Sequence, residues 1–208
     1  MEAGYKETNI SNEIVDLSKR LFQQRGYKAF SYRDIAKEIG IKTSSIHYYF
    51  PTKDDLAFAI VKKYRNEFRI DRENIDQETK DPKSRIDLYL ALFVESFMKN
   101  KNICFCSMLA SDFVNLSDSV KEEVNNLFAD NIDWISNVLK DGLNKKIFSF
   151  EEKPDDLAGV IFSSLEGATI TSRTFGHDQA LLNTFYWIKK MYESKEKGFI
   201  SKYLSRSR

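Results

Sequence analysis

The stretch SYRDIAKEIGIKTSSIHYYFPTKDDL, residues 31–56, predicts two short helices joined by a tight turn. Ser31 followed three residues later by Asp34 matches a capping box, in which the hydroxyl and the carboxylate bind backbone N–H groups that a helix start leaves unpaired. Gly40 accepts the left-handed backbone that ends a helix. The second helix ends before Pro51, because proline disfavours helical geometry at the preceding residue.

The second helix has one apolar side and one polar side. Thr43, Ser44 and Ser45 offer hydroxyl oxygens as caps at its start, and Ile46 and Phe50 can hold it on a core. The side chains left facing outward are those of Lys42, Thr43, Ser44, Ser45, His47 and Tyr48. Such a face suits DNA, because the second helix of a helix-turn-helix lies in the major groove.

Two sets of side chains are therefore predicted to contact DNA. The residues expected to read or adjoin bases are Arg33, Lys42, Thr43, Ser44, His47 and Tyr48, with Ser45 beside them. The residues expected chiefly to hold phosphates are Ser31, Tyr32, Tyr49, Thr52 and Lys53. Thr52 and Asp55 form a second capping box, which places Lys53 in the first turn of the next, long helix. An ordinary helical bundle is the alternative, but a bundle does not need this exposed polar face.

The run LFQQRGYKAFSYRDIAKEIGIKTSSIHYYFPTKDDL, residues 21–56, closely resembles the N-terminal DNA-binding domain of the tetracycline-repressor (TetR) family of bacterial regulators. The resemblance is carried by LF near a helix end, GY, DIA, GI, SSIHYYF and K-x-x-L, all in register. It implies a homodimeric, all-helical, ligand-responsive repressor. In that family the long helix corresponding to the one that starts at Lys53 couples ligand binding to the spacing of two DNA-reading heads.

The expected fold is all-α, with an N-terminal three-helix DNA-binding domain and a larger C-terminal helical domain for ligand binding and dimerisation. The first helix spans about Asn9–Arg25, with Asn9 or Ser11 as its cap. We expect residues 1–52 to form the DNA-binding helix-turn-helix domain, residues 53–198 the regulatory domain, and residues 199–208 a C-terminal tail.

The composition fits a helical protein and excludes several classes. Among 208 residues, 42% are hydrophobic, and only three prolines and eight glycines interrupt the chain, which favours helices. The net charge of +1 shows no broadly basic surface, so composition alone does not indicate DNA binding. No apolar run could span a bilayer and the polar N-terminus is not a signal peptide, so we expect a cytoplasmic protein without a membrane partner.

The second domain is rich in apolar and aromatic residues, as a ligand cavity between helices requires. The candidate ligand-binding residues, with Asn131, Glu166 and Thr169 as polar anchors, are Phe93, Phe97, Cys106, Met108, Phe113, Phe128, Asn131, Trp134, Phe162, Glu166, Thr169 and Phe175. For any one of these, an ordinary core position is the alternative. The expected partner is a small apolar or aromatic effector.

Cys104 and Cys106 are two residues apart, so on a helix they point in different directions and are badly placed to share a metal ion or to form a disulfide with each other. No metal site and no cofactor are predicted. The pair follows Lys99 and Lys101 at a predicted helix start, where dipole and cations favour thiolate. CSMLASDF and the later SLEGATITSR resemble one TetR branch, some of whose members use a cysteine near this position. Cys106 is thus a candidate sensor of oxidants or electrophiles, with a small apolar core residue as the alternative.

Dimerisation is predicted through the last two helices, Asp155–Arg173 and Asp178–Lys195. Small residues there allow two helices to approach closely, and large apolar residues provide surface that a dimer can bury. The candidate interface residues are Gly159, Ser163, Gly167, Phe185, Ile188 and Met191. A two-fold dimer with two reading heads requires an inverted-repeat operator in double-stranded DNA.

Two other functions compete with this interpretation. An enzyme is disfavoured, because the chain has only two histidines and lacks a glycine-rich phosphate loop, a nucleophile elbow and a metal-spaced His/Glu cluster. An architectural or effector-independent DNA-binding protein would lack a ligand cavity. The long aromatic-rich second domain argues against it.

Overall fold

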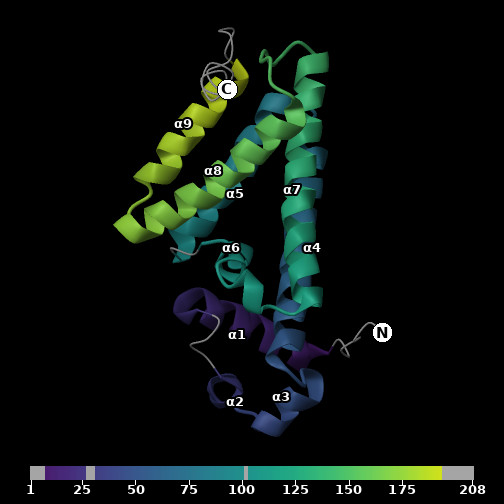
Figure 1. Cartoon of the computed structure of the whole chain (residues 1–208), viewed down its shortest axis with the longest axis vertical. Coiled ribbons are helices and arrows are strands. Elements are labelled where there is room, and N and C mark those ends of the chain that lie inside the picture. Colours follow the sequence, from purple (N-terminus) through teal and green to yellow (C-terminus); the bar gives the residue numbers. More distant parts are fainter. Residues whose placement is uncertain (1–7, 27–30, 101–102, 194–208) are drawn as a thin grey trace. The chain divides into compact units, whose positions relative to one another are not determined.

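The computed structural model describes residues 8–26, 31–100 and 103–193, and within these ranges the chain forms helices and no strand (Figure 1). The predicted all-α fold is confirmed for this part of the chain. The elements are α1 (Asn9–Arg25), α2 (Tyr32–Ile39), α3 (Thr43–Tyr49), α4 (Lys53–Glu78), α5 (Pro82–Asn100), α6 (Phe105–Ala110), the 3-10 turn η1 (Phe113–Asn115), α7 (Asp118–Asn144), α8 (Pro154–Phe175) and α9 (Gln179–Glu193).

The helices belong to two compact units. The N-terminal unit comprises Met1–Phe68 and Cys104–Leu127, and the C-terminal unit comprises Arg69–Ile103 and Phe128–Arg208. The long helices α4 and α7 therefore each contribute residues to both units. The domain boundary at residue 53, and the tail from residue 199, stay predictions.

In the N-terminal unit, α1 packs against α2, α3 and α6. The apolar stripe of α1 is buried, with Ile14 and Val15 fully inaccessible to solvent. Ile46 and Phe50 are also fully buried, as their spacing predicts, so α3 is fixed to the core by one side. Gly40 ends α2 with a φ of 80°, the left-handed conformation predicted for it.

Two helix caps differ from the prediction. The N-cap of α1 is Thr8 rather than Asn9 or Ser11, and Ser11 is instead its capping-box partner, donating through its hydroxyl to the Thr8 carbonyl at 2.9 Å. The N-cap of α3 is Lys42, which makes no side-chain cap hydrogen bond. A lysine side chain has no acceptor for a backbone N–H. The hydroxyls of Ser44 and Ser45 lie inside the first turn of α3 rather than before it.

Helix α6 is part of the N-terminal core. The Phe105 ring is fully buried, with its centroid 4.4 Å from that of Phe22 on α1 and 6.1 Å from that of Tyr64 on α4. The Lys19 ammonium lies over the Tyr64 ring and pairs with Glu67 at 2.7 Å. A helix that is distant in sequence thus completes the core that supports α1.

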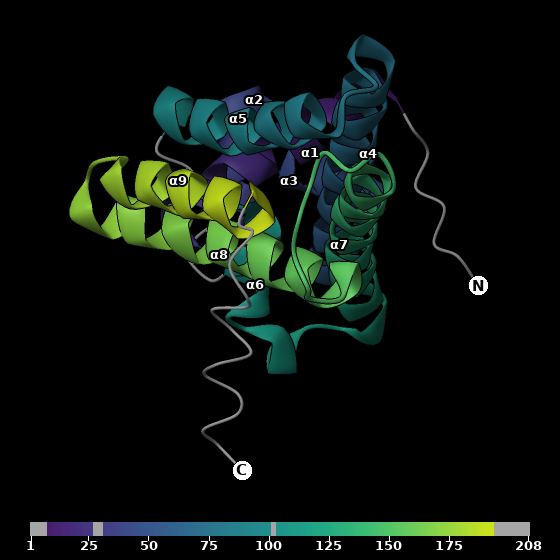
Figure 2. The same ribbon diagram turned by 90° about the horizontal axis from the view of Figure 1, so that it is seen from above.

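In the C-terminal unit, α8 and α9 lie side by side, and α5 contacts both (Figures 1 and 2). Gly176 ends α8 in the left-handed conformation, with φ of 77°. The Ser172 hydroxyl accepts a hydrogen bond from the Leu181 N–H at 3.1 Å, which fixes the start of α9 to the end of α8.

The turn after α7 depends on Gly142. The N–H groups of Ile147 and Phe148 donate to its carbonyl at 2.9 and 3.1 Å. The buried Phe148 ring covers the glycine so closely that an added Cβ would lie 2.0 Å from its Cδ2 atom. No side chain fits there unless this ring moves.

Gly142→Ala is therefore expected to destabilise the protein by about 1–3 kcal/mol, the usual cost of overpacking. The expectation holds even though alanine normally stabilises a helix relative to glycine by about 0.5–1 kcal/mol. Urea denaturation measures the change. The double variant Gly142→Ala/Phe148→Ala should lose less stability than the sum of the losses in the two single variants. Strict additivity would contradict the close contact.

Candidate nucleic-acid interface

Helices α2 and α3 pack on each other around the Gly40 turn and form the predicted helix-turn-helix. The capping box of Ser31 and Asp34 at the start of α2 is present, and the Ser31 hydroxyl donates to the Asp34 carboxylate at 2.7 Å. The turn geometry thus follows from local sequence signals. It holds α3 with its polar side directed away from the core.

Tyr32 fixes α2 to the start of α4. Its side chain is buried and its hydroxyl donates to the Thr52 carbonyl at 2.5 Å. Burial raises the pKa of Tyr32, and the negative charges of Asp55 and Asp54 raise it further, so the hydroxyl stays protonated and can donate. Its ring also makes an edge contact with His47 at 4.8 Å. This differs from the predicted phosphate contact: the hydroxyl is used inside the chain, and Tyr32 positions its neighbours.

The predicted base-reading side chains lie at the surface of α2 and α3. Those exposed are Arg33, Lys42, Ser44, His47 and Tyr48, and those half-buried are Thr43, Ser45 and Tyr49. Tyr48 is 73% exposed, a large value for an aromatic residue, and its ring meets that of Tyr49 edge-on at 5.1 Å. The His47 Nδ1 atom lies 3.3 Å from the Pro51 carbonyl oxygen, which orients the ring at the end of α3.

The start of α4 adds the remaining predicted phosphate ligands. The second capping box is present: the Thr52 hydroxyl donates to Asp55 at 2.7 Å, and the Asp55 N–H donates back to that hydroxyl at 3.1 Å. Lys53 follows in the first turn and is half-buried. Burial lowers the pKa of Lys53, and the nearby Asp34 opposes that shift.

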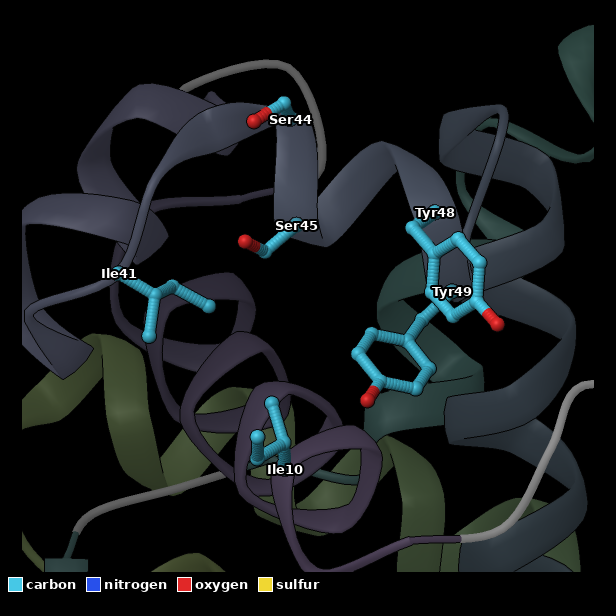
Figure 3. Close-up of a pocket in the computed structure, with 6 residues that line it drawn as sticks. All are labelled: Ile10, Ile41, Ser44, Ser45, Tyr48 and Tyr49. Atoms are coloured by element: carbon cyan, nitrogen blue, oxygen red, sulfur yellow. The ribbon is translucent and has the colours of Figure 1, made fainter.

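A groove of about 330 Å³ lies between the start of α1 and α3 (Figure 3). Its lining residues are Ile10, Ile41, Ser44, Ser45, Tyr48 and Tyr49. Sequence reasoning did not assign Ile10 and Ile41 to the DNA-facing surface. Ile10 lies one turn before the buried part of the apolar stripe of α1 and is 43% exposed.

The structure divides the predicted ligand residues between the two units. Cys106, Met108 and Phe113 belong to the N-terminal unit. The C-terminal unit contains Phe93, Phe97, Phe128, Asn131, Trp134, Phe162, Glu166, Thr169 and Phe175. Within that unit the Phe128 and Phe162 rings meet at 5.2 Å and Phe93 and Phe97 are buried, whereas Phe175 is 65% exposed at the end of α8.

A buried polar group lies among these aromatic residues. Asn131 is fully buried, and its side-chain oxygen accepts hydrogen bonds from the Tyr89 hydroxyl and from the Arg72 guanidinium, each at 2.9 Å. Trp134 lies beside Tyr89 and donates to Asp76 at 3.0 Å. Sequence reasoning missed Arg72 and Tyr89. Arg72 lies on the same helical side as the buried Ile75, which is a signal that could have identified it.

The other two polar anchors lie on α8. Glu166 is buried, and its backbone carbonyl accepts a hydrogen bond from the Thr169 hydroxyl at 2.8 Å. The Thr169 side chain thus makes this bond within its own helix.

Cys104 and Cys106 lie at the start of α6, as predicted, with Cys104 at the N-cap. Neither cysteine forms a disulfide, and both are buried, Cys106 completely. Of the two lysines expected to favour thiolate, Lys99 is exposed near the end of α5 and Lys101 lies outside the described residues. Burial shields both thiols from reagents in solution.

The predicted dimer residues occupy two different sides of α8 and α9. Ser163 and Gly167 are exposed and Gly159 is half-buried. Ile188 is 1% exposed and belongs to the core of its own unit, and Phe185 and Met191 pack partly buried against that core. These three side chains face inward. The exposed apolar side chains of the two helices are Val160, Ile170, Phe175, Leu182, Tyr186 and Trp187.

A membrane-spanning helix is not found: none of the helices in the described ranges is long and apolar enough to cross a bilayer. The same ranges contain no group of three or more His, Cys, Asp or Glu side chains that could hold a metal ion.

The geometry of α1 to α3, with a tight glycine turn and an exposed polar second helix, defines a helix-turn-helix DNA-binding protein. Residues 14–60 match the family model described as "Bacterial regulatory proteins, tetR family". A structure of a TetR-family transcriptional regulator from Agrobacterium tumefaciens superposes with a TM-score of 0.84 at 26% identity, covering 88% of this chain and 97% of that one.

Curated relatives agree with this match. YxaF, an HTH-type transcriptional regulator of Bacillus subtilis, is 28% identical over 167 residues, which cover 78% of this chain and 84% of that protein. YuxN of the same species is 28% identical over 95 residues, which cover 46% of this chain but only 32% of that protein. Residues 14–60 therefore form a DNA-binding domain of the TetR family, whose members are transcriptional regulators and not enzymes, and the fold of the chain is similar to that of a TetR-family regulator over most of its length.

Proposed function

We propose that the protein is a homodimeric repressor that binds an inverted-repeat operator and is released by a small apolar or aromatic effector. The observation that carries the proposal is the exposed face of α3, held on the core by Ile46 and Phe50. The bond from Tyr32 to the Thr52 carbonyl sets the start of α4 beside that face. Reading and phosphate-holding groups are thereby preorganised on one surface.

The exposed sides of α8 and α9 support the dimer. On α8 the exposed residues recur every three or four positions, as in a helix–helix interface, at Val160, Ser163, Gly167, Ile170 and Thr174. On α9 the exposed Leu182, Tyr186 and Trp187 form the neighbouring stripe. Trp187 and Tyr186 replace the buried Ile188 as the proposed anchors. Small residues on one helix and large ones on the next suit a self-complementary two-fold patch.

The aromatic C-terminal unit supports the effector part of the proposal. Phe128, Phe162 and Trp134 offer apolar surface, and Asn131 offers a buried polar anchor. Because α4 is continuous through both units, a ligand that moves its C-terminal part can move its start at Lys53. A ligand that weakens operator binding about 100-fold must supply about 2.7 kcal/mol of coupling free energy.

Modification of Cys106 is the second route to release. Its support is the position of α6, which packs on α1, so a bulky adduct on the thiol would displace a helix of the DNA-binding core. Burial requires that α6 opens before the thiol reacts. If Cys106→Ser leaves release by quinones, aldehydes or hypochlorite unchanged, this route is excluded.

The experiment that tests the function is selection of bound sequences from random duplex DNA, with and without thiol oxidant. A two-fold symmetric site is expected under reducing conditions. Recovery of an asymmetric site would contradict the dimer, and recovery of no site at low salt would contradict the function. An architectural DNA-binding protein, the competing candidate, would select no defined sequence and would show no ligand-dependent melting temperature.

Replacing Lys53 should weaken binding to every sequence about equally, because its ammonium is proposed to contact phosphate. For Lys53→Gln, the slope of log affinity against log salt concentration should fall by about one. Fluorescence anisotropy over a salt series measures this. Lys62→Gln, an exposed lysine further along α4, is the control and should change neither quantity. Thr43→Ala should instead alter sequence preference, and the opposite pattern would reverse the two role assignments.

A further inference from the structure

We propose that the groove between α1 and α3 holds a deoxyribose–phosphate segment of the DNA strand that borders the bases read by α3. Ile10 and Ile41 would contact the sugar carbons, and the hydroxyls of Ser45 and Tyr49 would donate to phosphate oxygens. This inference rests on the proposed function. It adds a backbone-binding site that contains no charged residue.

The lining of the groove matches this occupant chemically. Figure 3 shows Ser45 between Ile41 and the two tyrosine rings, with Ile10 of α1 on the remaining side. The six lining residues include two aliphatic side chains, two aromatic rings and four hydroxyls, and none of them is charged. A DNA strand alternates apolar sugar carbons with phosphate oxygens. Side-chain hydroxyls are common donors to those oxygens.

The groove is continuous with the proposed reading surface. Ser44, Ser45 and Tyr48 line the groove and also belong to the exposed side of α3. In the proposed complex, a strand whose bases meet α3 would pass beside Ile10, which lines the same groove. The first turn of α1 contains no acidic residue, and Lys42 is exposed at the start of α3, so the charges near the groove suit a polyanion.

The size of the groove argues against a second protein copy as the occupant. A specific protein interface buries about 800 Å² on each partner. Only six residues line this groove, and its volume of about 330 Å³ fits a short polymer segment rather than a protein surface.

Ile10→Ser tests the inference with a matched control. Ile10 is 43% exposed, so the change removes apolar surface from the groove with little loss of core. We expect about fivefold weaker binding to the selected operator and to other sequences alike, since the contact reads no base. The salt slope should stay unchanged, in contrast to Lys53→Gln. Ile70→Ser, at an isoleucine of 42% exposure on α4, should bind as the wild type does.

Hydroxyl-radical footprinting tests the inference first on the wild-type complex, where no variant has to fold, and then on variants. In the wild-type complex, deoxyriboses next to the bases protected by α3 should be shielded from cleavage. In Ile10→Ser that protection should be reduced, while Ile10→Val should retain it.

Several outcomes would overturn the inference. Unshielded sugars in the wild-type complex, wild-type affinity of Ile10→Ser, or a changed sequence preference would exclude a sugar–phosphate contact. A shift of Ile10→Ser to lower mass in light scattering would assign the groove to a second copy. If the wild type binds no duplex, the proposed function fails as well, whereas a binding wild type with an unaffected Ile10→Ser removes only this inference.

Discussion

Replacing Trp187 by glutamate is expected to convert the dimer into monomers and to weaken operator binding by about 10²–10⁴-fold. The indole is 66% exposed on α9, next to Tyr186 at 57%, and both are proposed to be buried against the partner. A carboxylate there would be desolvated without a counter-ion, which a dimer interface does not tolerate. Loss of the second head also removes the gain from binding two half-sites together. Light scattering and a DNA-binding assay on the same sample measure both effects.

Val114→Glu is the matched control for this experiment. Val114 is 88% exposed in η1 and lies outside α8 and α9, so the same new charge should leave mass and affinity unchanged. A Trp187→Glu protein that remains dimeric would show that the two subunits meet elsewhere.

Phe105→Ala is expected to cost about 3–5 kcal/mol of stability, the usual loss for a buried phenylalanine. The ring is fully buried, and it contacts Phe22 of α1 and Tyr64 of α4. Because α1 supports α2 and α3, we also expect weaker DNA binding before global unfolding. Chemical denaturation and operator titration at increasing urea concentrations measure the two effects.

Phe113→Ala provides the comparison for this second prediction. Phe113 is only half-buried in η1, so its truncation should cost clearly less. Equal losses for the two variants would show that Phe105 does not contribute specifically to the N-terminal core.

The sequence predicts best where structure depends on neighbouring residues. The capping boxes of Ser31 with Asp34 and of Thr52 with Asp55 form as predicted, because both partners lie on one helical turn. The cap of α1 was predicted less well. Asn9, Ser11 and Thr8 are all competent caps, and only the reciprocal bonds between Thr8 and Ser11 decide among them.

Residue roles that depend on tertiary packing were not predictable in the same way. Tyr32 is a polar aromatic residue next to a DNA-facing turn, and only the position of the Thr52 carbonyl shows that its hydroxyl is used internally. Ile188 and Trp187 are adjacent apolar residues on α9, and the sequence pattern did not show which of them faces the core. Ile10 lines a groove because the fold brings α3 beside the start of α1, and the sequence around Ile10 does not show this.

The core of the N-terminal unit is not contiguous in sequence, since Phe105 completes it from beyond α5. The DNA-reading head is therefore not a transferable cassette. A chimera that joins residues 1–52 to a foreign regulatory domain would leave Phe22 facing a helix that evolved for another partner. To exchange operator specificity between relatives, α6 must therefore be transferred together with the DNA-binding helices, so that α1 keeps the helix against which it packs.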